Sequence, residues 1–142
     1  MTQIKPICVA VIICESIIVD QETKNKTLVG LFNGIGCDSF PSYQPRMSVL
    51  ISLTDIHGTT DFSIEFLRDT EEGESRILLL SGTLTSPNPV DVVDFVFNLR
   101  KFPLKSAAVY TVRIAHRPSG AILAQRNFRA ILIGEPNTGE KK

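Results

Sequence analysis

Apolar and polar residues alternate along several separate segments of this chain, and this alternation constrains the fold more than any other feature. In residues 109–116, the apolar side chains of Tyr110, Val112 and Ile114 are separated by the side chains of Thr111 and Arg113. Successive side chains of a β-strand point to opposite faces, so a period of two predicts strands with one buried face. The same pattern recurs in three further segments, at residues 47–53, 62–66 and 93–99.

The segment at the C-terminal side predicts a hairpin over residues 109–133, with its turn at residues 117–120. A two-residue loop would mix apolar and polar side chains on each face. A type I turn through Pro118, followed by Gly120 in a left-handed bulge, restores a consistent inner face. This register pairs Tyr110 with Phe128, Ile114 with Ala124, and His116 with Ile122.

Two side chains of this hairpin carry specific expectations. Arg126 falls opposite Val112 on the inner face, so we expect its stem to be buried and its head to reach an edge or a carboxylate. Tyr110 begins its strand after a connection that contains proline, the position of the tyrosine corner in immunoglobulin-type sandwiches. We therefore expect the Tyr110 hydroxyl to bond a nearby backbone group.

The other segments complete the predicted order of strands. Residues 7–19 are apolar with a polar break, which predicts a long first strand that passes from one sheet to the other. Residues 27–32 predict the second strand, and the turn-rich residues 33–45 predict a loop across the end of the fold. The acidic residues 69–74 predict a turn, followed by a strand over residues 77–85. We interpret residues 55–58 as a hairpin turn and residues 102–107 as a connection into the closing hairpin.

About eight strands and no helix of three turns predict an all-β fold, an antiparallel two-sheet immunoglobulin-like sandwich, with a barrel as the structural alternative. We expect a single domain over residues 1–134 and a flexible polar tail over residues 135–142. A chain of 142 residues can bury roughly two-thirds of its unfolded surface. It therefore needs no disulfide or metal to fold.

Charge is distributed unevenly along a chain whose net charge is zero. Residues 1–97 carry six Lys or Arg against thirteen Asp or Glu, and residues 98–142 carry nine against two. Such asymmetry can mark a nucleic-acid surface. Strands from both regions interleave in a sandwich, however, so we expect local neutralisation, and nucleic acid is not a predicted partner.

Cys8, Cys14 and Cys37 are an odd number without paired spacing, which favours reduced thiols in a cytoplasmic protein. Cys8 and Cys14 lie about 20 Å apart along one strand, too far to bind the same ion. We predict no metal and no cofactor. No apolar run is long enough to span a bilayer, so a membrane partner is not expected.

Candidate binding residues lie in two loops, and no catalytic residue is predicted. His57 is flanked by Asp55 and Asp61, but no nucleophile elbow accompanies them. Phe40 and Tyr43 lie in the turn-rich loop, where aromatic residues often recognise partners. The alternative for these two rings is that they cap the core beneath the loop. The predicted binding residues are Phe40, Tyr43, Asp55 and His57.

Several stretches resemble a family of small bacterial proteins described only as a domain of unknown function with a β-sandwich fold. The resemblance rests on residues 14–20, 28–32, 40–41, 88–99 and 109–110, which together span most of the chain. It implies a fold and a bacterial cytoplasmic setting, and no activity.

From the residues themselves, we predict a non-catalytic protein-interaction or scaffold module rather than an enzyme. Its partner would be another protein or a second copy of the chain, bound through an exposed strand edge or the apolar first strand. The alternative is a small-ligand-binding or hydrolytic domain that acts through the loop residues around His57.

Overall fold

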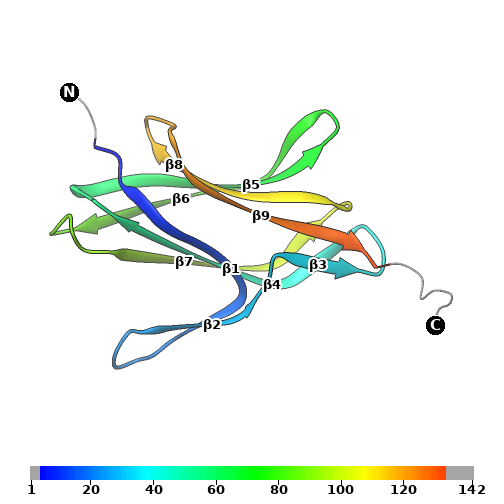
Figure 1. Cartoon of the computed structure of the whole chain (residues 1–142), viewed down its shortest axis with the longest axis horizontal. Coiled ribbons are helices and arrows are strands. Elements are labelled where there is room, and N and C mark those ends of the chain that lie inside the picture. Colours follow the sequence, from blue (N-terminus) through cyan, green and yellow to red (C-terminus); the bar gives the residue numbers. More distant parts are fainter. Residues whose placement is uncertain (1–3, 134–142) are drawn as a thin grey trace.

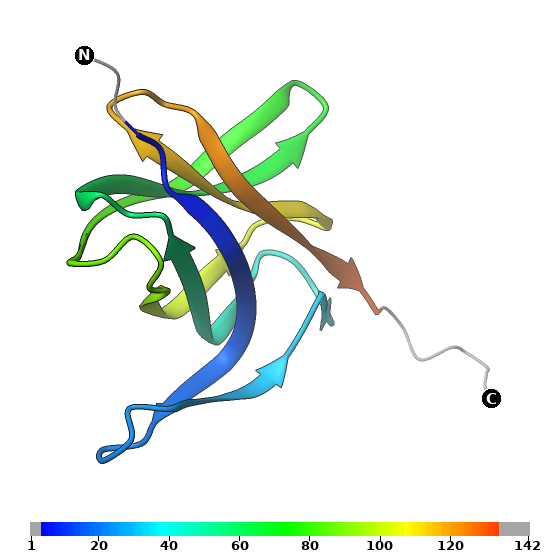
Figure 2. The ribbon, with the colours of Figure 1, turned by 60° about the vertical axis from the view of Figure 1, so that its left-hand side comes forward.

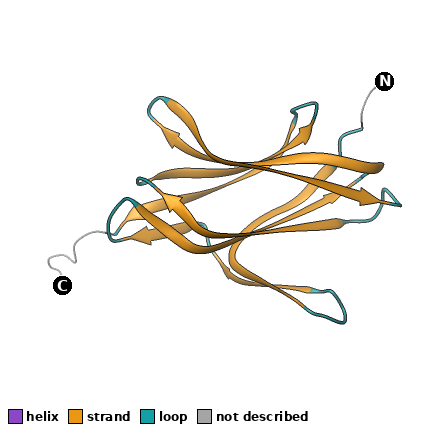
Figure 3. Ribbon diagram, turned by 180° about the vertical axis from the view of Figure 1, so that it is seen from behind, coloured by secondary structure: helices purple, strands orange, loops and turns teal. Residues whose placement is uncertain are grey.

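The computed structural model describes residues 4–133, and the regular structure within them is entirely β (Figure 1 and Figure 3). The all-β prediction is therefore confirmed, with nine strands in place of about eight. The predicted tail over residues 135–142 lies outside the described residues. In chain order the strands are β1 Ile7–Val19, β2 Lys26–Leu31, β3 Gly34–Cys37, β4 Ser42–Thr54, β5 Gly58–Thr70, β6 Gly73–Ser86, β7 Val93–Leu104, β8 Ala108–Arg117 and β9 Ile122–Leu132.

The strands form two sheets that lie face to face (Figure 1 and Figure 2). The first has the order β2-β1-β4-β7, and the second has the order β3-β9-β8-β5-β6. Alternate residues of the central strands point between the sheets and form one hydrophobic core, as their period of two predicts. Fully buried members from the two sheets include Met47, Val49, Ile51 and Leu53, and Phe62, Ile64, Phe66, Val112 and Ile114.

The closing hairpin has the predicted bulged register along most of its length. Tyr110 pairs with Phe128 and Ile114 pairs with Ala124, while Gly120 adopts a φ of 78°. The register shifts between Ile114 and Ala115, so Ala115 is the residue opposite Ile122. The predicted pair of His116 with Ile122 is therefore wrong by one residue.

The Arg126 side chain behaves as its inner position requires. It pairs with Val112 in the sheet, and its guanidinium reaches the β1 edge, where it donates to the carbonyl oxygen of Val11 at 3.4 Å. A second nitrogen donates to Asn33 Oδ1 at 2.9 Å. The prediction of an edge contact is confirmed, with a carbonyl and an amide oxygen as the acceptors.

Sequence reasoning missed β3, which lies inside the predicted loop over residues 33–45. This short strand runs parallel to the end of β9, with Ile35 opposite Ala130 and Cys37 opposite Leu132. Two of its four residues, Gly34 and Gly36, are glycines, so no alternation was visible. At Gly36 a Cβ would lie 2.8 Å from the Ile133 side chain, a close approach that favours glycine.

Two predicted connections are wrong. β1 does not change sheets at its polar break; the chain crosses between β2 and β3. Residues 55–58 do not form a hairpin turn, because β4 and β5 belong to different sheets. This segment instead carries the chain from one sheet to the other, and the side chain of its residue Ile56 is buried.

Strand β7 continues through residues 102–104, which the sequence reading placed in a connection. Phe97 and Leu99 pack on the core before Lys101, whereas Phe102 and Leu104 are buried after it. Lys101 has a φ of 55°, and this left-handed residue reverses the side-chain alternation within one strand. The broken alternation therefore marks an irregularity inside the strand and not its end.

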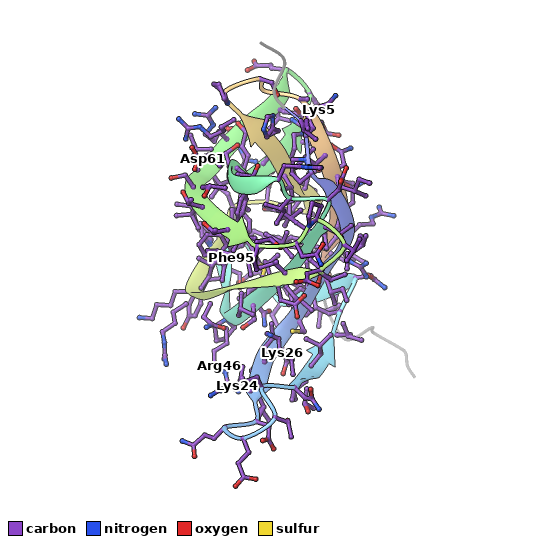
Figure 4. The ribbon with its side chains drawn as sticks, turned by 90° about the vertical axis from the view of Figure 1, so that its left-hand side faces the viewer. Lys5, Lys24, Lys26, Arg46, Asp61 and Phe95 are labelled. Atoms are coloured by element: carbon purple, nitrogen blue, oxygen red, sulfur yellow. The ribbon has the colours of Figure 1, made fainter. Side chains whose placement is uncertain are left out.

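The far half of β1 leaves the body of the protein with β2. Cys14 is the last β1 residue paired with β4, and from Ser16 to Val19 the strand pairs with β2. We call residues 15–31 the arm. In Figure 4, Lys24 lies at the far tip of the arm, well away from Phe95 in the body.

Candidate binding groove and exposed arm

The structure brings two of the predicted binding residues together. His57 Nε2 lies 2.8 Å from Asp55 Oδ1, and both side chains are substantially exposed. Asp61 is engaged elsewhere, since its Oδ1 accepts a hydrogen bond from the Thr83 hydroxyl at 2.8 Å. Neither Asp55 nor His57 lines the groove or the depression described below. This pair is a solvent-facing contact in a loop between the sheets.

Phe40 and Tyr43 lie at the opposite end of β4 from this pair. The twelve residue steps from Tyr43 to Asp55 span about 40 Å of extended strand, so the four predicted residues do not form one site. Phe40 packs against the core, whereas Tyr43 is exposed and has the Lys101 ammonium 6.0 Å from its ring centroid. The core-capping interpretation therefore holds for Phe40 and fails for Tyr43.

The three thiols are unpaired and lie in apolar surroundings. Cys14 and Cys37 are buried, and Cys8 is partly buried. Burial raises the pKa of the Cys8 and Cys14 thiols, which lowers their nucleophilicity at neutral pH. Within residues 4–133, no three metal-ligating side chains converge on one point.

A groove opens between the two sheets at the end where β4 begins and β7 ends. It has a volume of about 350 Å³. Its walls come from the start of β4, the end of β7, and the facing parts of β5 and β6. One wall is formed by Pro41, Ser42, Pro103 and Leu104, and the other by Arg68, Ser75, Arg76 and Ile77, with Lys105 at the rim.

Arg68 is the central residue of this end of the molecule. It pairs with Tyr110 across β5 and β8, a register that points its side chain between the sheets. Its Nε atom is buried, and no acceptor among the described residues lies within hydrogen-bond distance. Arg68 and Lys105 also line an adjoining open depression of about 720 Å³, together with Asp69 and Glu71. Both concavities therefore meet at a guanidinium with an unused donor.

The alternation within β5 contains a signal for Arg68, which was not among the predicted site residues. Phe62, Ile64 and Phe66 occupy the inner positions of β5, and the next inner position in this alternation is Arg68. A charged residue where the pattern requires a buried one is costly unless it reaches water or a partner. Arg126 also occupies an inner position of its strand, and its guanidinium reaches the carbonyl oxygen of Val11 on β1.

A second feature is the exposed apolar surface of the arm. Ile18 and Leu31 are 57% and 60% exposed, and Val19 and Val29 are also exposed. Lys26 ties the arm to the body, with its Nζ 3.3 Å from Asp94 Oδ2. A two-stranded hairpin without a covering layer is only marginally stable in water. The arm therefore presents apolar side chains and a strand edge that nothing in the described chain covers.

The outer face of the second sheet carries a charged network instead of a patch of one sign. The Arg113 guanidinium donates to both Glu74 carboxylate oxygens, at 3.0 and 2.7 Å, and to Gln125. Glu65 accepts from Arg76 at 2.7 Å. Hydrogen bonds from Arg113 lower the pKa of Glu74, and the carboxylate in turn raises the pKa of Arg113. Arg113, from the basic C-terminal region, thus neutralises Glu74 of the acidic region, as predicted.

The fold and these two surfaces define an all-β protein of two facing sheets, with a cationic groove at one end and an exposed apolar arm. Its sequence matches a family model over residues 9–128, and the chain belongs to this family of unknown function (DUF6941). The predicted resemblance to an uncharacterised family is confirmed. No curated protein matches the chain. Within residues 4–133 there is no helix with the length and apolarity to cross a membrane.

The chain also has a distant similarity to a solved structure of another protein. It is the alkylpurine DNA glycosylase AlkC of Pseudomonas fluorescens, bound to DNA containing an abasic site analog. The similarity covers 85% of this chain and 30% of that chain, with 11% sequence identity and a TM-score of 0.44. The present chain therefore spans less than a third of that protein.

Proposed function

We propose that this protein is a non-catalytic interaction module that associates with a second copy of itself through the arm. The observation that carries the proposal is the exposed apolar arm, with Ile18, Val29 and Leu31 open to solvent. Apolar side chains held in water contribute no hydrophobic free energy until another surface covers them. A covering partner would convert this marginal hairpin into part of a larger sheet.

A second copy supplies a complementary edge for the arm. β2 is the outermost strand of its sheet, so its outer side offers unpaired backbone donors and acceptors. Two such edges can pair antiparallel about a two-fold axis, which is the commonest symmetry of homo-oligomers. Lys24 at the arm tip offers a cation to Asp20 or Glu22 of the second copy, while Lys26 is paired with Asp94 of the body.

The outer face of the first sheet carries a partly exposed apolar row beside the arm, with Leu50, 9% exposed, at its centre. Ile12 pairs with Leu50, and Leu50 pairs with Val96, which places the three side chains in one row across the sheet. Their chain neighbours Val11 and Val49 face the core, so this row faces outward. We propose that the arm of the second copy lies against this row.

Association can be measured by size-exclusion chromatography with light scattering between 1 and 200 µM protein. We expect a concentration-dependent dimer, twice the 15.7 kDa of the chain. The double variant Val29→Lys, Leu31→Lys should be monomeric, because it places charge on the proposed contact. The matched control is Leu79→Lys, which alters a similarly exposed apolar residue on β6 and should leave the dimer intact. A parent protein that stays monomeric at 200 µM would contradict the proposal.

We also propose that the two sheets form an immunoglobulin-like sandwich. The orders β1-β4-β7 and β9-β8-β5 correspond to strands A, B, E and G, F, C of immunoglobulin domains. The tyrosine corner at Tyr110 supports this assignment, since its hydroxyl donates to the carbonyl of Ser106. The three free thiols support a reducing compartment, the bacterial cytoplasm, as the place where the protein works.

A further inference from the structure

The groove beside Arg68 has the composition of a site for a small organic anion. We propose that it binds a carboxylic acid with a short aliphatic body, with the carboxylate on Arg68 and the aliphatic chain between the sheets. This site is separate from the arm: it lies between β4, β7, β5 and β6.

The charges that line the groove favour an anion. Arg68 and Lys105 contribute two cations, and no Asp or Glu is part of the lining. Arg76 also borders the groove, but its guanidinium donates to Glu65 on the outer face of the sheet and adds no free charge. The planar guanidinium can donate two parallel hydrogen bonds to one carboxylate. The buried Arg68 Nε has no acceptor among the described residues, so the protein itself leaves part of the hydrogen-bonding capacity of this guanidinium unused.

The apolar walls favour an aliphatic body over a bare inorganic ion. Ile77 and Leu104 contribute aliphatic side chains to the lining, and Pro41 and Pro103 add apolar rings on the β4 and β7 side. A volume of about 350 Å³ is at the small end of ligand pockets and holds an acid of about six carbons. The hydroxyls of Ser42 and Ser75 add neutral hydrogen-bonding groups to the lining.

The adjoining depression determines which side of Arg68 the anion occupies. Asp69 and Glu71 line that depression, and they would repel a carboxylate. The acid-free groove is therefore the favourable side for an anion. A ligand there would lie against β6 and β7, with its carboxylate toward Arg68.

Binding can be tested by titrating the full chain with sodium hexanoate to 20 mM, monitored by ¹H–¹⁵N correlation spectra. We expect saturable shifts confined to the backbone amides of residues 42, 68–77 and 104–106. Hexan-1-ol, which matches the aliphatic body without the charge, should bind at least tenfold more weakly. Sodium acetate, which keeps the charge without the body, should also bind more weakly than hexanoate.

Single variants test whether Arg68 binds hexanoate or whether any loss of positive charge changes the Kd. Arg68→Gln should raise the hexanoate Kd at least tenfold, because it removes the charged hydrogen bonds. Lys105→Gln, at the exposed rim, should raise it by about two- to fivefold and tests the site even if Arg68→Gln does not fold. The matched control is Arg117→Gln, at the opposite end of the molecule, which should leave the Kd unchanged.

Three results would overturn the proposal. The first is the absence of saturable shifts at 20 mM hexanoate, and the second is saturation at residues outside the groove. The third is equal binding of hexanoate and hexan-1-ol, with a Kd that neither Arg68→Gln nor Lys105→Gln changes. Saturable, charge-dependent binding in the groove would support it whatever the oligomeric state proves to be.

Discussion

The hydroxyl of Tyr110 donates a hydrogen bond to the carbonyl oxygen of Ser106, four residues earlier in the chain, at 2.8 Å. The ring itself is fully buried and stacks on Phe128 with 5.4 Å between centroids. This one side chain therefore joins the core to the connection between β7 and β8. The bond that the sequence predicted for a tyrosine corner is confirmed.

Replacing Tyr110 by phenylalanine should destabilise the protein by about 1 kcal/mol. The ring and its packing would remain, and only the bond to Ser106 would be lost. Urea unfolding followed by circular dichroism measures the change. Tyr43→Phe is the control, because Tyr43 is exposed and has no buried bond to lose. Equal stability of parent and Tyr110→Phe would show that the corner contributes nothing.

Gly82 on β6 should not tolerate a side chain. It lies directly opposite Phe62, and a Cβ at this position would be 2.7 Å from Cζ of that ring. Phe62 is fully buried and packs edge-on against Phe95, so it cannot move without disturbing the core. We expect Gly82→Ala to cost about 1–3 kcal/mol in the free energy of unfolding. Ser81→Ala, at the exposed neighbouring position, should change it by less than about 0.5 kcal/mol.

Sequence alternation predicted the fold wherever one residue in two is buried, as in β5 and β8. It failed where a local backbone irregularity reverses the pattern. Lys101, with its positive φ, is such a case, and the glycine-rich β3 offered no pattern to interpret. The choice of sheet for each strand depends on contacts far apart in the sequence, so the connection at residues 55–58 was misread. The candidate groove was missed because its walls come from four strands.

The thiols should react slowly in the native protein. Burial raises the pKa of Cys8 and Cys14, which reduces the thiolate fraction at pH 8 and leaves little access to a reagent. We expect Cys8, the least buried thiol, to react first with Ellman's reagent, and all three to react promptly in 8 M urea. Cys8→Ser should remove this first reaction of the native protein. A native Cys14 as reactive as free glutathione would show that the centre of β1 opens readily.

The contact between Arg113 and Glu74 should make stability depend on pH. Hydrogen bonds from Arg113 lower the pKa of Glu74 in the folded state, so folding favours the ionised carboxylate. The stabilisation is fully present above the ordinary carboxyl pKa of about 4.3, and it is lost as the pH falls through the lowered folded value. Urea unfolding should therefore show Glu74→Gln less stable than the parent at pH 7, with the two converging below pH 3. Glu72→Gln, in the adjacent turn, is the control and should follow the parent across this range. Because Glu74 is exposed, 0.5 M NaCl should reduce the difference at pH 7, and a difference that persists unchanged at pH 2.5 would contradict the electrostatic explanation.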